Sequence, residues 1–183
     1  FLLELDNLKL TEKLSHNKFI PEKYFYGSYK ERIDLLRGLL DTDGTITKNG
    51  AISYTTTSLQ LAKDTQKLIW SVGGLSTIKE KQTYFTYKNT RKKGKKSYVV
   101  SVRLSQQNNL FSIERKKNRL PSNYQYKNKL KNEISKIEFL NNEECVCIYI
   151  DDPKHLYITD NYITTHNTTI VEGLAKKIVE KKT

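Results

Sequence analysis

Leu36-Arg37-Gly38-Leu39-Leu40-Asp41-Thr42-Asp43-Gly44 joins an apolar helical pattern to a short acidic turn. Upstream, Ser28 can cap a helix, and Glu31 stands three positions later, as in a capping box. Apolar side chains then recur at helical spacing as far as Leu40. The sequence therefore predicts a helix over residues 28–40, which the acidic turn at residues 41–44 brings to an end.

A hairpin and a second helix are predicted next. Residues 45–48 and 51–57 flank Asn49-Gly50, and this dipeptide is the strongest short signal for a hairpin. Ser58 can cap a helix over residues 59–72, and Gly73-Gly74 can end it. The side chains expected on the inner side of this helix are Leu61, Thr65, Leu68, Ile69 and Val72.

Two further strands are predicted at about residues 75–88 and 96–104, joined by a basic loop over residues 89–95. The order helix, hairpin, helix, hairpin over residues 28–105 predicts an α+β fold. In such a fold the helices cover one face of an antiparallel sheet. The other face is then free to bind a partner.

The flanking segments are less regular. Residues 1–25 are predicted to form a short helix followed by a loop, and residues 106–142 a polar linker. Short strands containing Cys147 and Tyr157 are expected to follow. Apolar spacing then predicts a last helix over residues 168–179.

The formal net charge is +12, which indicates a polyanionic partner, most often nucleic acid. A Lys-rich codon bias is the alternative explanation. The charge is concentrated: residues 79–96 carry eight basic side chains against the single acid Glu80, and residues 115–131 carry seven more. No signal peptide or long apolar stretch is visible, so we expect no membrane partner and an intracellular location, in cytoplasm or plastid.

The acidic segment, residues 36–44, resembles the signature of LAGLIDADG homing endonucleases. The similarity extends over residues 8–120. It includes Lys18-Phe19-Ile20-Pro21, Tyr54-Thr55-Thr56-Thr57-Ser58 and Gly73-Gly74. The resemblance implies a half-domain that cuts double-stranded DNA site-specifically with Mg²⁺ or another divalent cation. An acidic turn that merely caps a strand is the alternative interpretation.

The resemblance also assigns roles within the half-domain. It implies that small Gly38 allows a second such helix to pack closely, that Asp43 binds the metal, and that Asp41 is structural. Lys116 is the candidate catalytic lysine, with a solvated phosphate contact as the alternative. The residues expected to contact DNA, besides Tyr87, are Lys79, Lys81, Tyr84, Lys88, Arg91, Lys92, Lys93, Lys95, Lys96 and Arg103.

Residues 145–168 resemble the C-terminal splicing motifs of inteins, which belong to the all-β Hint splicing domain. An Asn between a His and a hydroxyl residue can cyclise and cut its own backbone, as in His166-Asn167-Thr168. By this resemblance Asn167 cyclises, His166 and His155 transfer protons, and Thr168 accepts the acyl group.

The role of Cys147 is open at this stage. In one intein class a Cys at this position is the branching nucleophile and is paired with a Thr where Thr165 stands. A buried strand cysteine is the alternative. Cys145 is interpreted as structural.

Residues 168–179 resemble the helix after the P-loop in Clp-type AAA+ ATPases, so residues 168–183 are expected to be a C-extein. The chain has no Met and begins in an apolar pattern, so we expect a fragment or processed precursor that lacks the N-terminal intein half and the N-extein. The expected segments are 1–25, the end of a preceding endonuclease half; 26–122, the endonuclease half; 123–140, a linker; 141–167, the splicing segment; and 168–183.

Three functions compete on this sequence. The first is a partial intein with a homing endonuclease, which interrupts a P-loop ATPase. The second is a freestanding LAGLIDADG endonuclease. The third is a DNA-binding or maturase-like module without cleavage. The set Cys147, His155, His166 and Asn167 argues against the second, and intact Asp43 argues against the third.

Overall fold

The computed structural model describes residues 2–105, 110–121, 130, 133–139, 141, 142, 144, 148 and 150–166. The chain divides into two compact units, Phe1–Lys131 and Asn132–Thr183. The first unit contains two long helices and a four-stranded sheet. The described part of the second contains a two-stranded hairpin.

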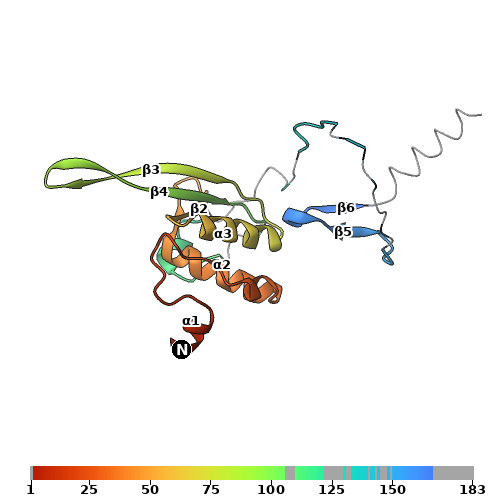
Figure 1. The fold of residues 1–183 in the computed structure, drawn as a ribbon, viewed down its shortest axis with the longest axis horizontal. Coiled ribbons are helices and arrows are strands. Elements are labelled where there is room, and N and C mark those ends of the chain that lie inside the picture. The colour runs from red at the N-terminus through yellow and green to blue at the C-terminus, as the bar shows by residue number, and fades with distance from the viewer. Residues whose placement is uncertain are drawn as a thin grey trace, which may run out of the picture. The chain divides into compact units, whose positions relative to one another are not determined.

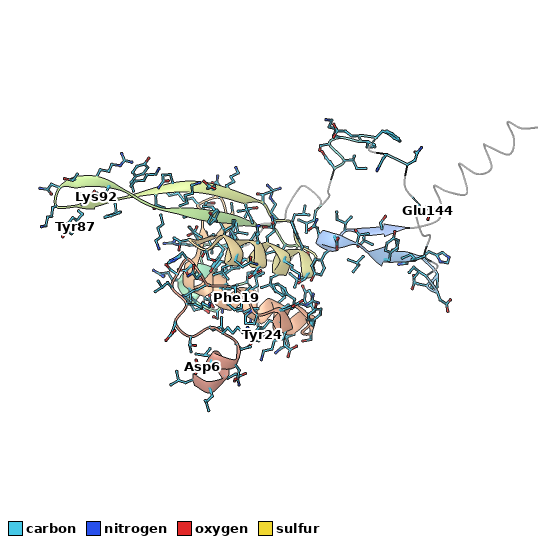
Figure 2. All side chains as sticks on the ribbon, viewed as in Figure 1. Asp6, Phe19, Tyr24, Tyr87, Lys92 and Glu144 are labelled. Atoms are coloured by element: carbon cyan, nitrogen blue, oxygen red, sulfur yellow. The ribbon has the colours of Figure 1, made fainter. Side chains whose placement is uncertain are left out.

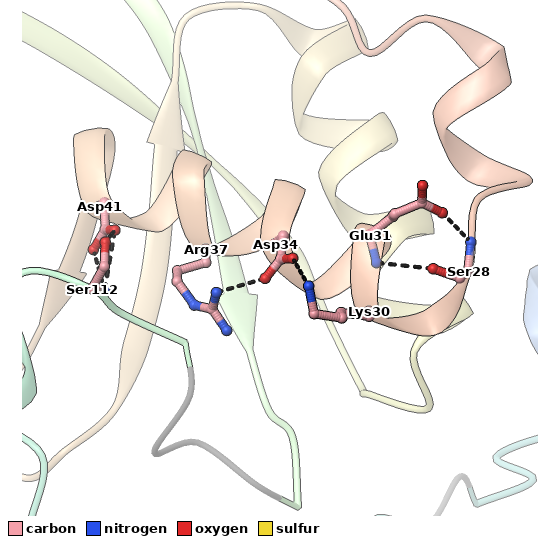
Figure 3. A network of polar contacts seen from close by, with 7 residues as sticks. All are labelled: Ser28, Lys30, Glu31, Asp34, Arg37, Asp41 and Ser112. Atoms are coloured by element: carbon pink, nitrogen blue, oxygen red, sulfur yellow. Dashed lines mark hydrogen bonds and ion pairs between the residues drawn. The ribbon is translucent and has the colours of Figure 1, made fainter.

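Helix α2, Tyr29–Asp43, begins as predicted (Figure 3). The Ser28 backbone N–H donates to the Glu31 carboxylate at 2.7 Å, and the Glu31 N–H donates to the Ser28 hydroxyl at 3.3 Å. This reciprocal pair satisfies two helix-end donors that would otherwise lack a partner. The predicted capping box is confirmed.

The predicted end of this helix is wrong by three residues. The acidic segment 41–43 belongs to α2, and the helix stops at Gly44, whose φ of −79° is extended. Gly44 is needed for space, since a Cβ atom there would lie 2.3 Å from the Leu40 carbonyl oxygen. The acidic residues therefore stand on the last helical turn and do not form a free turn.

The four-stranded sheet is antiparallel throughout, with strand order β1-β2-β4-β3. Its strands are β1 (Gly44–Ile46), β2 (Ile52–Thr56), β3 (Ile78–Tyr87) and β4 (Thr90–Val102). The predicted first hairpin is confirmed, with Gly50 in the left-handed region at φ 78°.

Helix α3, Leu59–Ser71, is capped by the Ser58 hydroxyl, which accepts from the Leu61 N–H at 3.1 Å. Gly73 has a φ of 79°, and the Gly74 N–H closes the helix end on the Ile69 carbonyl at 2.9 Å. The five side chains predicted for the inner side of this helix are all buried.

Both helices cover one face of the sheet (Figure 1). Leu36 and Leu40 of α2 pack with Ile69 of α3 and with Tyr54 and Val100 of the sheet, and all five are at most 2% exposed. The α+β arrangement predicted over residues 28–105 is confirmed. The opposite sheet face carries no helix in the part of the first unit that the structure describes.

The second hairpin is longer than predicted. The predicted basic loop at residues 89–95 is wrong, because Thr90 to Lys95 lie in β4. Only Lys88 and Asn89 form the turn, with φ of 47° and 59°. A two-residue turn with both φ positive matches the strand twist. Figure 1 shows this β3–β4 arm extending beyond the helices.

The N-terminal segment contains α1 (Leu2–Asn7) and the 3₁₀ helix η1 (Glu22–Phe25), and the short helix predicted there is confirmed. The segment between them is tied to α3. The Ile20 N–H donates to the Asp64 carboxylate at 2.9 Å, and the Ser58 hydroxyl donates to the Lys18 carbonyl at 2.6 Å.

Part of the predicted polar linker, residues 106–142, is packed into the first unit. Leu110 and Phe111 are at most 1% exposed, and they precede the short helix α4, Glu114–Lys117. Two adjacent apolar side chains in a polar stretch give too little periodicity for an assignment to the core from sequence. This segment nevertheless places a lysine at the end of α2.

The second unit contains β5 (Leu156–Ile158), the 3₁₀ turn η2 (Asp160–Tyr162) and β6 (Thr164–His166). The strand predicted around Tyr157 is confirmed. The strand predicted around Cys147 and the helix predicted over residues 168–179 lie outside the described residues. Among the helices that the structure describes, none has the length and apolar character needed to cross a bilayer.

Candidate functional site

The two acids at the end of α2 have different surroundings. The Asp41 carboxylate accepts hydrogen bonds from the Ser112 N–H at 3.0 and 3.1 Å and from the Ser112 hydroxyl (Figure 3). It also accepts one from the Ile113 N–H at 3.4 Å. It therefore holds the start of α4 against the end of α2. The structural role expected for Asp41 agrees with these contacts.

Two opposing effects act on the pKa of Asp41. Partial burial raises it, but the hydrogen bonds from Ser112 and Ile113 and the charge of Lys116 outweigh burial, so the net pKa is below the usual 3.8. A carboxyl group with a lowered pKa adds stability when ionised, and this stability disappears as the pH falls through the folded-state pKa.

A first prediction follows for acid unfolding. The difference in unfolding free energy between wild type and Asp41→Asn should be largest near neutral pH and should shrink below about pH 4, because the wild-type carboxylate becomes protonated there. Urea titrations of both proteins across this range measure the difference. A difference that stays constant with pH would show that the Asp41 charge adds no stability.

Asp43 is the last residue of α2, and its side chain is exposed. Within the described residues it has no hydrogen bond or ion pair, unlike Asp41. The Tyr54 hydroxyl has a pKa raised to about 12, mainly by burial. The negative charge of Asp43 adds to this increase in pKa. Asp43 is therefore the acid on this helix that is available to a cation.

The described residues contain no group of three or more His, Cys, Asp or Glu side chains that could hold a metal ion. Mg²⁺ needs fewer protein ligands, since one or two carboxylates with waters and phosphate oxygens complete its shell. Asp43 fits as one of those carboxylates.

Lys116 is buried, with 9% of its surface exposed. Its ammonium nitrogen Nζ donates to the carbonyl oxygens of Leu40 at 2.7 Å, Asp41 at 2.8 Å and Gly44 at 2.8 Å. These contacts use all three protons and place a positive charge at the negative end of the helix. Lys116 thus fixes the backbone on both sides of Asp43, and its predicted catalytic role remains a prediction.

The uncovered sheet face is defined by strand register. Lys79 pairs with Val99 and Lys81 with Ser97, on the face opposite half-buried Ile78 and its buried partner Val100. Arg103 follows buried Val102 and belongs to the same uncovered face. Within β1 to β4, all of which the structure describes, the lone carboxylate is Glu80, and it lies on the helix side.

A β-bulge separates the sheet from the outer part of the arm. Gly94 and Lys95 of β4 stand opposite Thr83 alone, and a Cβ atom on Gly94 would lie 2.5 Å from the Thr83 hydroxyl oxygen. The Thr83 hydroxyl donates to the Lys95 carbonyl at 2.6 Å, and the Gln82 amide donates to the Gly94 carbonyl at 2.7 Å. The bulge is thus held by side chains.

The outer arm carries exposed aromatic rings, and Figure 2 labels Tyr87 and Lys92 near its tip. The Arg91 guanidinium lies 4.5 Å from the centre of the Tyr84 ring, and the Lys92 ammonium lies 5.0 Å from the Tyr87 ring. By register, Tyr87 and Lys92 share the side of Lys79 and Lys81, whereas Tyr84 and Arg91 are on the other side. The predicted DNA-contacting residues are therefore divided between two faces.

Other members of the predicted DNA set also have partners inside the chain. Lys96 pairs with Glu80 at 2.6 Å, and the Lys95 ammonium contacts the His16 ring nitrogen Nδ1 at 2.8 Å. The Lys88 ammonium lies over the Tyr87 ring at 5.6 Å. Their assignment to DNA remains a prediction.

The hairpin of the second unit brings part of the predicted splicing set together. Leu156 pairs with His166, and Tyr157 pairs with Thr165. His155 directly precedes Leu156, so along the chain it is next to the residue that pairs with His166. The His155 ring nitrogen Nδ1 lies 2.8 Å from the Ile150 carbonyl oxygen, which orients the ring. Cys145, Cys147, Asn167 and Thr168 lie outside the described residues.

Comparison with known proteins agrees with this geometry. Residues 30–112 match the sequence profile described as the LAGLIDADG-like domain. The chain is also similar to the replicative DNA helicase DnaB of Mycobacterium intracellulare, with 29% identity over 160 residues. That alignment covers 84% of this chain and 26% of the helicase, so the chain spans about a quarter of its curated relative.

LAGLIDADG domains bind double-stranded DNA, are typically DNA endonucleases and generally use divalent metals. The profile begins at the first turn of α2 and ends at Ser112, the residue that holds Asp41. The acidic helix, both hairpins and α3 all fall inside this match. Residues 30–112 of this chain therefore form a LAGLIDADG-like domain.

Proposed function

We propose that the chain is part of an intein and that its first unit is one half of a metal-dependent, site-specific DNA endonuclease. The observation that carries the nuclease proposal is the difference between the two acids at the end of α2. Asp41 is used to hold Ser112, whereas Asp43 is exposed and unpaired within the described residues. Nearby, the uncovered sheet face presents cations and no carboxylates.

Cutting both DNA strands requires two acidic helices. Gly38 is exposed, and a Cβ atom there would meet nothing within 4 Å, so the outer side of α2 has room for a closely packed helix. A preceding half of the same protein, or a second copy, supplies that helix in this proposal. The resemblance of residues 36–44 to paired family motifs supports it.

The division of roles in cleavage follows from the residues present. A divalent cation, when bound, supplies an activated water and stabilises the leaving oxygen. Asp43 holds the cation, Lys116 fixes the helix end that carries Asp43, and the sheet cations bind the DNA backbone. Lys79, Lys81 and Arg103 on the uncovered face are the best placed of the predicted contacts.

Metal removal tests this nuclease function. The full-length protein that carries residues 1–183 should cut duplexes selected from a random pool by binding to it, and EDTA should stop the cutting. Added Mg²⁺ should restore cleavage, because a cation held by Asp43 would activate the attacking water and offset the developing charge. Gel analysis of end-labelled duplexes measures both. Cleavage that continues unchanged in EDTA would contradict the metal role.

For the second unit we propose self-splicing, in which Asn167 cyclises and Thr168 takes the acyl group. His155 directly precedes the hairpin that ends at His166, and Thr165 lies in it, which supports their joint action. Cys147 is the proposed branching nucleophile. The host is proposed to be a P-loop ATPase of Clp type, from residues 168–183. That the chain matches about a quarter of a longer helicase also supports an insertion within a host.

The splicing proposal predicts cleavage between Asn167 and Thr168. Asn167→Ala should abolish it, because alanine has no carboxamide nitrogen to attack the backbone carbonyl. Mass spectrometry of the purified precursor distinguishes the intact and cleaved chains. Asn142→Ala is the matched control, since Asn142 is an exposed asparagine of the same unit, and it should cleave as wild type. Equal cleavage in the Asn167→Ala precursor would exclude this chemistry.

A further inference from the structure

A groove runs beside the end of α2, along edge strand β1 and against α4. Its cavity has a volume of about 230 Å³ and adjoins a second cavity of about 460 Å³. The first is lined by Thr42, Gly44, Thr45, Ile46, Arg115, Lys116 and Arg119. The second shares Ile46 and Arg119 and extends to Thr47 and Lys48.

The charge of this groove is entirely positive. Its lining holds Arg115, Arg119 and Lys48 with no carboxylate. Lys116 lies at the base, with its ammonium group bound to backbone carbonyls. In the part of the chain that the structure describes, the guanidinium groups of Arg115 and Arg119 are exposed and have no hydrogen bond or ion pair. By contrast, neighbouring Lys117 pairs with Glu114 at 2.9 Å.

The groove is continuous with the proposed DNA surface. Thr45 lines it and also lies on the uncovered sheet face, because its neighbours Gly44 and Ile46 are buried. Gly44 lines it too and directly follows Asp43. A DNA strand that lies on the sheet and reaches Asp43 therefore passes the mouth of the groove.

We propose that this groove binds a phosphate of the DNA backbone through Arg115 and Arg119, and that it sets the strand's position at Asp43. The inference rests on the proposed function, because it names a phosphate site beside the proposed cutting residue. Arginine suits this role, since its planar fork of donors binds phosphate oxygens in pairs. The contact is independent of base sequence and fixes register.

Fluorescence anisotropy tests the proposal without any cleavage. The full-length protein, in EDTA, is titrated into a short labelled duplex of random sequence at several salt concentrations. The Arg115→Ala/Arg119→Ala variant should bind about 10- to 100-fold more weakly at low salt. Its plot of log affinity against log salt should be less steep by about one, since loss of the contact with one phosphate removes roughly 0.9 from the slope.

The control removes the same charge elsewhere. Lys23 pairs with Glu4 and Lys30 with Asp34, so Lys23→Ala/Lys30→Ala also lowers the net charge by two. This variant should bind within about twofold of wild type with an unchanged salt slope. If both double variants lose the same affinity, net charge explains the effect and the phosphate site is rejected.

Other outcomes are equally decisive. Wild-type affinity and salt slope in the arginine variant would overturn the site, whether or not the protein cuts DNA. Failure of the wild-type protein to cut DNA would instead count against the nuclease function, with the binding comparison still valid. Arg115→Gln/Arg119→Gln, which keeps the side-chain bulk, gives the same readout if the alanine variant unfolds.

Discussion

Asp43→Asn is expected to lower the rate of DNA cleavage by the full-length protein by about 100-fold or more. The carboxylate is exposed and has no partner within the described residues, so its replacement removes a cation ligand and little structure. A 100-fold loss corresponds to about 2.7 kcal/mol of transition-state stabilisation, which is within the range that a bound metal supplies. Single-turnover cleavage of a selected duplex measures the rate.

Two measurements accompany this test. DNA affinity should change little in Asp43→Asn, because binding depends on phosphate contacts made by Lys and Arg. Asp41→Asn is the matched control and should lower stability while it retains the cation site. If Asp43→Asn cuts as fast as wild type, or if the Asp41 variant alone loses cleavage without loss of stability, the assignment of Asp43 is wrong.

Lys116→Met is expected to lower the unfolding free energy of the first unit by about 3 kcal/mol and its melting temperature by roughly 10 °C. Methionine retains most of the buried chain but has no donor. The carbonyls of Leu40, Asp41 and Gly44 would then lose the hydrogen bonds that Lys116 gives them. The Leu40 carbonyl would keep the hydrogen bond from the Gly44 N–H. Each buried carbonyl that is left without a partner costs about 1 to 3 kcal/mol.

Lys117→Met is the control for Lys116. Its surface ion pair with Glu114 contributes at most about 1 kcal/mol, so the substitution should barely change the melting temperature. Thermal unfolding followed by circular dichroism compares the two. A Lys116→Met protein that melts like wild type but no longer cuts DNA would show that Lys116 acts in catalysis and has little structural role.

Local signals in the sequence predicted much of the first unit. The Ser28 capping box, the Asn49-Gly50 turn and the Ser58 cap act within a few residues, so their patterns are visible in sequence. The end of α2 was mispredicted because its carbonyls are satisfied by Lys116, more than 70 residues away. The turn at Lys88-Asn89 was missed because it adopts two positive φ angles without glycine.

The candidate site was predictable to a smaller extent. The resemblance separated Asp43 from Asp41, but nothing in the sequence indicated that Ser112 binds the Asp41 carboxylate. The sequence did not show which basic residues lie on the same face of the sheet. The bulge at Gly94 and the strand register decide the face of each cation. In the sequence, Arg115 and Arg119 could not be distinguished from the other basic residues of their run. The structure distinguishes them because they line the groove.

The attachment of Lys116 to the end of α2 has a consequence for the order of synthesis. Both helices and all four strands of the first unit precede Lys116 in the chain, so they leave the ribosome first. Until residues 110–120 emerge, the turn that carries Asp43 lacks both its lysine and Ser112. The nascent first unit can thus form its sheet before the end of α2 is fixed, and the geometry around Asp43 is completed only when this last segment is made.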